Sequence, residues 1–222
     1  MITLQIITVF VLSYLLGSIP FGLIFVKILK GHDIRNIESG RTGGTNAGRA
    51  AGLGAGVLTA IMDFFKAVIA VMIAQTIFKG QPWVEMGAAL FAILGHNYSI
   101  FLLERERPGK YVLRGGAGGA PCLGGSFAIW PPSLFIILPL GLLILFGVGY
   151  ASITTLSIAF LAIIIFTIRA AGPESSSWAY VVYGLISLLL LIIALIPNIK
   201  RLLSGNERLI GIRAWIKKRK ES

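Results

Sequence analysis

Three long stretches of the chain contain no charged residue, and they span residues 1–26, 121–168 and 179–199. One helix crosses the hydrocarbon core of a bilayer with about 20 apolar residues, so the second stretch is long enough for two crossings. The core of a soluble protein would alternate apolar with polar residues, and these stretches do not. Only 13% of the residues are charged, where a soluble domain has about a quarter. The sequence therefore predicts an all-α, polytopic membrane protein, with residues 1–222 forming a single integral membrane domain.

The apolar segments predict about seven transmembrane helices. Pro131 and Pro132 force a break in the longest run, because proline lacks a backbone donor and restricts the residue before it. The segment just before these prolines is short for a crossing, so a count of six also stays open. The predicted helices cover residues 3–26, 57–78, 84–103, 121–130, 133–149, 152–168 and 178–197.

The basic residues favour one orientation in the membrane. With the N-terminus outside, 17 of the 20 lysine and arginine residues fall in segments 27–56 and 104–119 and in the tail after residue 197. This is the positive-inside pattern of cytoplasmic segments. We expect a multi-pass protein of the bacterial cytoplasmic (inner) membrane, with the C-terminus and the glycine- and arginine-rich loops in the cytoplasm. The bilayer also accounts for the net charge of +11, so no nucleic-acid partner is expected, and the basic residues 217–220 are expected beside anionic headgroups.

The segment 27–56 has the composition of an anion site. Its glycines permit tight turns and expose backbone N–H groups, and its arginines carry donor forks that match phosphate geometry. Hydroxyl and amide side chains add neutral hydrogen-bonding groups. Composition alone leaves a flexible, positively charged loop as an equal alternative to an oxyanion site. The residues concerned are Ser39, Gly40, Arg41, Thr45, Asn46 and Arg49.

A second glycine-rich strip follows the third predicted helix. Arg114 precedes Gly115 and Gly116, and two such strips on one membrane face favour an anion site over a flexible loop. His96 lies near the inner end of that helix and can exchange a proton near neutral pH. An ionisable residue in a membrane segment is a functional-site hypothesis by default, and a histidine bonded to a neighbouring helix is the alternative.

Asp63 and Lys66 lie three residues apart on the second predicted helix and therefore share a face. We expect them to form a structural ion pair that supports the polar segments. The single cysteine, Cys122, excludes an internal disulfide and a cysteine-built metal site, and it is expected as a small buried residue.

An ordered set of short motifs resembles one family, the bacterial membrane acyltransferases that use acyl phosphate to acylate glycerol 3-phosphate (the PlsY type). Each motif alone is weak, but together they run in order over nearly the whole chain. The motifs are Gly17-Ser18-Ile19-Pro20-Phe21-Gly22, Asp33-Ile34-Arg35, the run from Ser39 to Arg49, Asp63-Phe64-Phe65-Lys66, Gly95-His96, Tyr150-Ala151-Ser152, Asn198-Ile199-Lys200-Arg201-Leu202-Leu203 and Gly205-Asn206-Glu207.

The resemblance implies seven helices, a cytoplasmic active site and an acyl transfer of phospholipid biosynthesis. The primary hydroxyl of glycerol 3-phosphate attacks the carbonyl of a fatty acyl phosphate, giving lysophosphatidate and phosphate. No cofactor, metal or obligate protein partner is implied. By position, the expected catalytic residues are His96, Ser39, Asn198 and Glu207. The expected substrate- and phosphate-binding residues are Arg49, Thr45, Asn46, Gly40, Arg41, Arg114, Gly115, Gly116 and Ser152.

Three departures from the family pattern change the local charge. Ala117 stands where the family has the second lysine of Lys-Gly-Gly-Lys-Gly, and Arg41 stands where it usually has asparagine. The segment after His96 is also longer, with residues 104–110 as the insertion. We hypothesise that Arg41 or Lys110 supplies the missing cation. The departures leave open an acyltransferase for another alcohol, a catalytically silent relative and a small-anion transporter, although the ionisable groups cluster at one membrane face.

Overall fold

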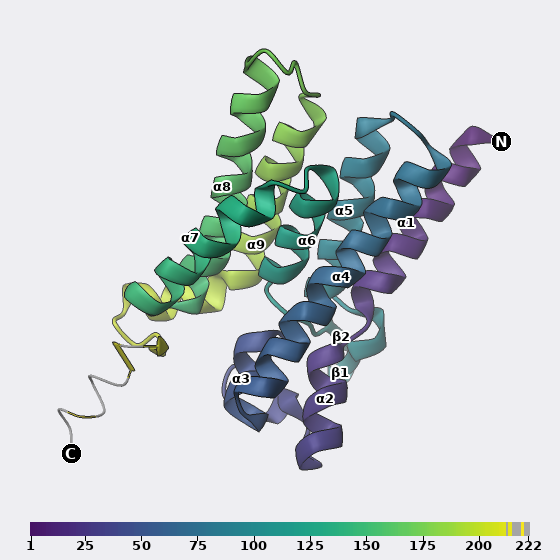
Figure 1. The fold of residues 1–222 in the computed structure, drawn as a ribbon. Coiled ribbons are helices and arrows are strands. Elements are labelled where there is room, and N and C mark those ends of the chain that lie inside the picture. Colours follow the sequence, from purple (N-terminus) through teal and green to yellow (C-terminus); the bar gives the residue numbers. More distant parts are fainter. Residues whose placement is uncertain (212, 215–218, 220–222) are drawn as a thin grey trace.

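The structure is a computed structural model that describes residues 1–211, 213, 214 and 219, so the basic residues 217, 218 and 220 lie outside the described part. It is a bundle of long helices with two shorter helices beyond one end (Figure 1). The bundle helices are α1 (Ile2–Ser18), α4 (Leu53–Ile77), α5 (Pro82–Asn97), α6 (Gly119–Ile129), α7 (Ser133–Gly147), α8 (Ala151–Ala171) and α9 (Ala179–Leu203). The shorter helices are α2 (Phe21–Lys30) and α3 (Gly44–Ala51).

The helices pack in two groups that meet at α5 and α6. Helix α1 packs on α4 and α5, and α8 packs on α9. Helix α5 also contacts α9, and α6 contacts both α4 and α8 (Figure 1). The main apolar core lies between these helices and contains the fully buried Ile93, Phe166 and Tyr183. The single cysteine, Cys122, is buried in the same core, as predicted.

The first predicted helix, residues 3–26, is wrong as a continuous helix. Helix α1 ends at Ser18, and Ile19 is extended with ψ 117°, because Pro20 disfavours helical backbone in the residue before it. Helix α2 then continues to Lys30 and ends at Gly31, whose φ of 68° lies in the left-handed region that glycine adopts without strain. The break directs α2 past the end of the bundle, where it packs on α3 and α4 (Figure 1).

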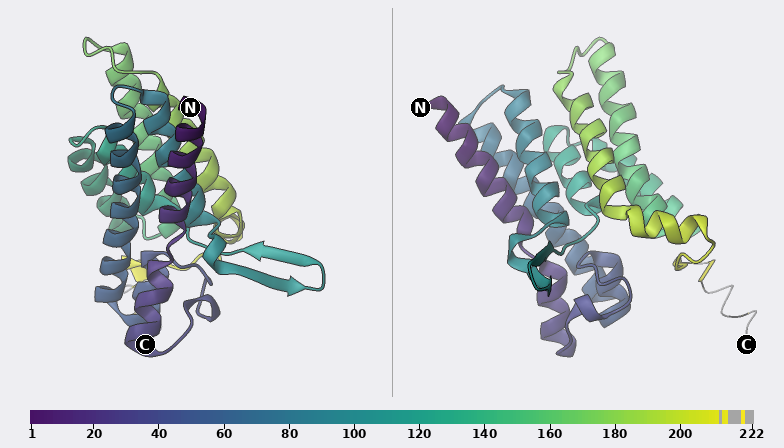
Figure 2. Two further views of the ribbon diagram at one scale, coloured as in Figure 1. Left: turned by 90° about the vertical axis from the view of Figure 1, so that its right-hand side faces the viewer. Right: turned by 180° about the vertical axis from the view of Figure 1, so that it is seen from behind.

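The third predicted helix, residues 84–103, is wrong at its end. Helix α5 stops at Asn97, and a short 3₁₀ helix, η2 (Ile100–Leu102), leads into a hairpin of β1 (Leu103–Arg107) and β2 (Lys110–Leu113). Pro108 and Gly109 form the turn, and Gly109 has a φ of 78°. The hairpin occupies the insertion expected at residues 104–110 and projects sideways from the bundle (Figure 2).

The remaining predicted helices are present, with shifted ends. The polar segment 27–56 contains the 3₁₀ helix η1 (Ile34–Asn36) and α3, and α9 runs six residues beyond the predicted end at Pro197. Within the described residues, four stretches are long and apolar enough to cross a membrane: Ile2–Lys30, Leu53–Ile77, Ala151–Ala171 and Ala179–Leu203. Helices α6 and α7 are shorter apolar helices. The fold is therefore helical and multi-spanning, and the count of seven crossings stays a prediction.

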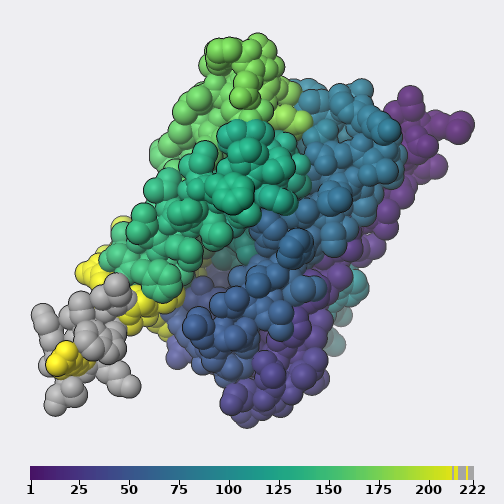
Figure 3. All heavy atoms as spheres, in the orientation of Figure 1, coloured from purple at the N-terminus to yellow at the C-terminus, as the bar shows by residue number. Residues whose placement is uncertain are grey.

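The outer surface of the bundle is apolar, as contact with lipid requires. Helix α7 lies along the face shown in the space-filling view (Figure 3). Its side chains Phe135 and Leu143 are 78% and 69% exposed. Large apolar side chains are also exposed on α1, α4, α8 and α9. A water-soluble monomer rarely exposes apolar surface on so many elements.

Glycines set the close approach of α1 and α5. A Cβ atom at Gly17 would overlap the backbone of Ala92, and one at Gly95 would overlap the carbonyl oxygen of Tyr14. Small residues at helix crossings let the backbones approach closely, which is the main source of packing energy between helices in lipid.

We predict that Gly17→Ala lowers the thermal unfolding midpoint in detergent micelles. The added methyl group must push α1 away from α5, and overpacking of this kind costs about 1–3 kcal/mol. Gly54→Ala is the matched control, because a Cβ at Gly54 in α4 meets no atom within 4 Å. An equal loss of stability in both variants would show that the α1–α5 crossing is not limited by this contact.

Candidate anion-binding site at the α3 end of the bundle

A pocket of about 300 Å³ lies at the α3 end of the bundle, where three parts of the structure meet. These segments are the loop before α3, the adjoining ends of α5 and β2, and the last turns of α9. The pocket brings together residues from sequence positions far apart. The predicted site residues that line it are Ser39, Gly40, Arg41, Arg114, Gly115 and Asn198.

Arg41 joins all three segments of this pocket. Its guanidinium donates one hydrogen bond to the carbonyl of Gly116, at 2.8 Å, and another to the carbonyl of Ala194 in α9. Among the described residues, Arg41 forms no ion pair with a carboxylate. Burial lowers the pKa of the Arg41 guanidinium, and the like charge of Arg201 lowers it further. Because the ordinary pKa of arginine is above about 12, the group stays cationic and is available to an anion.

The bend of α9 brings its polar end to the pocket. Pro197 lies inside α9 and lacks the N–H that would bond the carbonyl of Ile193, so the helix is weakened there. The last turns of α9 bend away from the rest of the helix (Figure 2). Asn198 and Arg201, three residues apart on the bent part, both line the pocket.

Asn198 and Glu207, both predicted as site residues, contact each other. The amide nitrogen of Asn198 donates to Glu207 Oε1 at 2.9 Å. The other oxygens of the pair, Asn198 Oδ1 and Glu207 Oε2, are buried and have no partner among the described residues. Next to them, Arg208 pairs with Glu38 at 2.6 Å and closes the C-terminal segment over the loop. The pair therefore presents two free acceptor oxygens beside a cationic pocket.

Glu104 connects the hairpin to the same end of the bundle. Its Oε1 lies 2.5 Å from Arg35 Nη1, and its Oε2 accepts from Arg114 Nε at 3.0 Å. Arg35 also binds Asp33, and this hydrogen bond lowers the pKa of the Asp33 carboxyl. Lys110 instead lies at the far end of the hairpin, 63% exposed and 2.6 Å from Glu106. Of the two residues hypothesised to supply the missing cation, only Arg41 lines the pocket.

A buried polar triad lies behind the pocket. Lys66 Nζ is 2.8 Å from Asp63 Oδ1, which confirms the predicted ion pair, and 2.9 Å from His96 Nδ1. Lys66 also donates to the carbonyl of Ile19 at 3.0 Å. All three side chains of the triad are at most 5% exposed.

His96 contacts the glycine strip with its other side. The carbonyl of His96 accepts a hydrogen bond from the N–H of Gly116 at 2.8 Å. A Cβ atom at Gly116 would overlap the Nε2 side of the imidazole. His96 therefore lies directly against the strip, although it does not line the pocket itself.

The other predicted site residues lie around the pocket. Thr45 and Arg49 are exposed on α3. Asn46 is buried, and its amide nitrogen donates to the carbonyls of Ile34, Ile37 and Arg41 at 2.9–3.3 Å, so it holds the shape of the loop. Ser152, at the start of α8, is buried with a hydroxyl that has no partner among the described residues. Phosphate contacts of these four residues remain predictions.

Three polar residues that line the pocket were not among the predicted site residues. Asn97 and Tyr98 follow His96 at the end of α5, and Arg201 lies on α9. Arg201 could have been found from Asn198, because residues three apart on a helix share a face. Asn97 and Tyr98 could not, because their position depends on where α5 ends.

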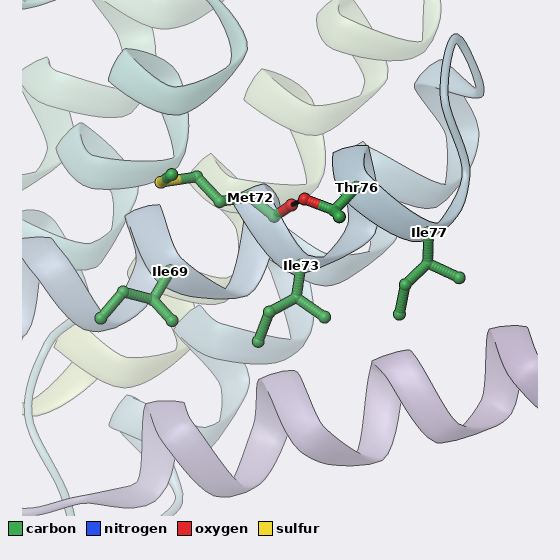
Figure 4. A pocket seen from close by; sticks show the side chains of 5 residues that line it. All are labelled: Ile69, Met72, Ile73, Thr76 and Ile77. Carbon is green, nitrogen blue, oxygen red and sulfur yellow. Dashed lines mark hydrogen bonds between the residues drawn. The ribbon is translucent and has the colours of Figure 1, made fainter.

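A second pocket, of about 450 Å³, is apolar and lies on α4. Ile69, Ile73 and Ile77 point toward α1 (Figure 4). It has no ionisable side chain in its lining and is a lipid-facing groove. Within the described residues, His, Cys, Asp and Glu also form no group of three that could hold a metal ion.

The fold and the site define a polytopic membrane protein with an arginine-lined pocket at one end of its helices. The family model for glycerol-3-phosphate acyltransferase matches residues 7–205. A glycerol-3-phosphate acyltransferase of Thermus thermophilus is 35% identical, over 91% of this chain and 94% of the relative. One of Moorella thermoacetica is 34% identical, over 92% and 97%.

A solved structure agrees with the sequence relatives. It is a crystal structure of PlsY, an integral membrane glycerol 3-phosphate acyltransferase, in its glycerol 3-phosphate form. Its TM-score is 0.80 at 30% identity, and the match covers 96% of this chain and 98% of that one. The chain therefore belongs to the glycerol-3-phosphate acyltransferase family and is a multi-pass membrane enzyme that transfers acyl groups.

We predict that Lys66→Met destabilises the protein by about 3–5 kcal/mol, because it leaves the buried Asp63 carboxylate without its cation. The double variant Asp63→Asn/Lys66→Met removes both charges and is expected to be more stable than Lys66→Met alone. The measurement is the thermal unfolding midpoint of Asp63→Asn, of Lys66→Met and of the double variant, all in one detergent. Additive losses would mean that the two charges do not depend on each other.

Proposed function

We propose that the protein moves a fatty acyl group from acyl phosphate to the sn-1 hydroxyl of glycerol 3-phosphate, at the cytoplasmic face of a bacterial inner membrane. Both substrates are phosphate anions. The observation that carries the proposal is Arg41, a buried guanidinium that lines the pocket and forms no ion pair among the described residues. Arginine offers a planar fork of donors that matches phosphate oxygens.

The reaction needs positioning more than covalent help. The sn-1 oxygen of glycerol 3-phosphate forms a bond to the acyl carbon, and the bond from that carbon to the phosphate oxygen breaks. The hydroxyl proton passes to the departing phosphate, so that lysophosphatidate and inorganic phosphate result. Two anions must be brought together, which makes charge stabilisation and orientation the main contributions of the protein.

Three arginines of the pocket divide naturally into two kinds. Arg41 and Arg201 have no carboxylate partner among the described residues, whereas Arg114 is bound by Glu104. We assign the binding of substrate phosphate to Arg41 and Arg201. We assign to Arg114 the positioning of the glycine strip that follows it. Ser39, Gly40 and Gly115 also line the pocket.

The Asn198–Glu207 pair is assigned to the acceptor alcohol. Hydroxyl groups need acceptor oxygens, and this pair has two buried ones without a partner among the described residues. An unsatisfied buried acceptor costs free energy that a substrate hydroxyl would recover. Glycerol 3-phosphate offers hydroxyls for these oxygens and a phosphate for the arginines.

The proposed orientation follows from charge and from the place of the pocket. The pocket, with Arg41, Arg114 and Arg201 in its lining, lies at the end of the bundle that carries α2, α3 and the hairpin. Figure 2 shows these elements at that end. Basic segments favour the cytoplasmic side. The acyl chain of the donor already resides in the bilayer, so a pocket at the end of the helices can receive its phosphate from the membrane surface.

We predict that purified protein releases phosphate only when palmitoyl phosphate and glycerol 3-phosphate are both present. Arg41→Asn is expected to lower kcat/KM about 10–100-fold, because a hydrogen bond to a charged group contributes about 1.5–3 kcal/mol. Lys110→Ala is the matched control and should leave kcat/KM unchanged, because Lys110 lies outside the pocket.

Phosphate release with equal rates in the wild type and Arg41→Asn would contradict the assignment of Arg41. No release by folded wild-type protein would contradict the proposed substrates, and other alcohols would then be tested as acceptors. The orientation is tested in sealed, inverted membrane vesicles, whose cytoplasmic face is turned outward. These vesicles are expected to form product when glycerol 3-phosphate is supplied from outside.

We predict that His96→Ala lowers the rate at every pH without changing the shape of the pH–rate profile. The imidazole is buried against Lys66 and the glycine strip, so we assign it to positioning that strip. The measurement is kcat/KM as a function of pH for both proteins. Loss of an acid limb in the variant would instead identify His96 as the general base.

A further inference from the structure

The hairpin β1–β2 leaves the bundle at the level where α1 ends. The hydroxyl of Ser99, just before the hairpin, donates to the carbonyl of Ser18 at 2.5 Å, and Tyr14 of α1 donates to the carbonyl of Tyr98. The 17 residues of α1 rise about 26 Å, close to the thickness of the hydrocarbon core of about 30 Å. The hairpin therefore emerges at the depth of the headgroups and runs across the direction of the helices (Figure 2).

The two faces of the hairpin differ in charge. Residues paired across the strands share a face, so Glu104 and Val112 lie on one face, and Arg105 and Tyr111 lie on the other. Glu104, on the first face, is bound by Arg35 and Arg114. Its charge is thus neutralised within the protein.

The opposite face, formed by Leu103, Arg105, Tyr111 and Leu113, carries a free cation among apolar groups. Arg105 is exposed and forms no ion pair with a described residue. Arg107, near the turn, pairs across the strands with Lys110 after a register shift and so does not share this face. Tyr111 is 63% exposed. Leu103 and the adjacent Phe101 are 49% and 59% exposed. This combination of arginine, tyrosine and exposed apolar side chains is typical of residues at the membrane–water interface.

The ion pair of Glu104 also fixes which way each face is turned. Arg35 belongs to η1, which follows α2 and therefore lies beyond the bundle end. The face with Glu104 is turned toward that outer layer. The face with Arg105 and Tyr111 is consequently turned away from that layer.

We propose that the hairpin β1–β2 lies on the membrane surface, with Arg105 binding anionic lipid headgroups and Tyr111 inserted at their level. The occupant is a lipid surface because the exposed apolar and aromatic groups adjoin this free cation at interfacial depth. A soluble acidic protein would match the cation but not the exposed apolar side chains of Phe101 and Leu103. Val112 and Leu113 also line the pocket, but the accessibility of a label on the hairpin is measured without substrates, so the test does not depend on the proposed function.

The test places a nitroxide label on either face of the hairpin. Tyr111→Cys and Val112→Cys are made in a Cys122→Ala background, which removes the one native thiol. In vesicles of equal parts phosphatidylglycerol and phosphatidylcholine, the label at position 111 is expected to be accessible to oxygen and shielded from a water-soluble nickel complex. The label at position 112 is expected to show the reverse preference.

The charge dependence is tested with Arg105→Gln in the position-111 protein. We expect its label to shift toward water, and we expect the same shift when the position-111 protein that keeps Arg105 is placed in pure phosphatidylcholine vesicles. Lys110→Gln is the matched control, because Lys110 is already paired with Glu106 and should not shift the label. The thermal unfolding midpoint in detergent shows that each variant is folded. A label at position 111 that is water-accessible in the anionic vesicles overturns the proposal and points instead to a soluble acidic partner.

Discussion

The ammonium group of Lys66 is the interaction on which the rest of the site depends. It donates to the carbonyl of Ile19, pairs with Asp63 and lies 2.9 Å from His96 Nδ1. The ammonium also lies 5.9 Å from the ring centroid of Phe21. The carbonyl of Ile19 lies at the break between α1 and α2, where it also accepts a hydrogen bond from the N–H of Phe21 at 3.2 Å. Lys66 therefore connects three elements, the break, α4 and α5, with one charged group.

The pocket is connected to this triad by backbone contacts. His96 accepts a hydrogen bond from the N–H of Gly116, and the carbonyl of Gly116 accepts from Arg41. Arg41 in turn donates to Ala194, in the part of α9 that Pro197 weakens. Each step is short and directional, so a displacement of the triad would be transmitted to Arg41. The buried ion pair would thereby contribute to the proposed function although it does not line the pocket.

The sequence predicted the helices well where apolar residues and turns were distinct, and poorly where one apolar run contained a break. Residues 3–26 carry no charge, so their composition favours one helix, and only the backbone restriction imposed by Pro20 reveals two. The hairpin was missed for a different reason. Along β1, acidic residues alternate with basic ones, as in Glu104, Arg105 and Glu106. The strand therefore lacks the alternation of apolar with polar residues that predicts a strand.

The candidate site shows the same limits. Residue types identified the two glycine- and arginine-rich segments, because phosphate chemistry demands those groups. The sequence could not show that Asn198 and Glu207 touch, since that contact depends on the turn after Leu203 and on the bend of α9. The sequence also could not show whether Arg41 or Lys110 lies where it could supply the missing cation. That distinction is geometric, and it required the hairpin to be placed.

Moving the cation from position 117 to position 41 is physically reasonable. A lysine on the glycine strip would be a point charge on a flexible stem, whereas Arg41 is held in a loop whose carbonyls are fixed by the amide of Asn46. Burial lowers the pKa of either side chain, but arginine begins higher and keeps its charge. Its fork binds two protein carbonyls and still has donors left for an anion. Under the proposed function, the exchange would replace a mobile cation with a fixed one, and a fixed arginine would lose little entropy when a phosphate binds.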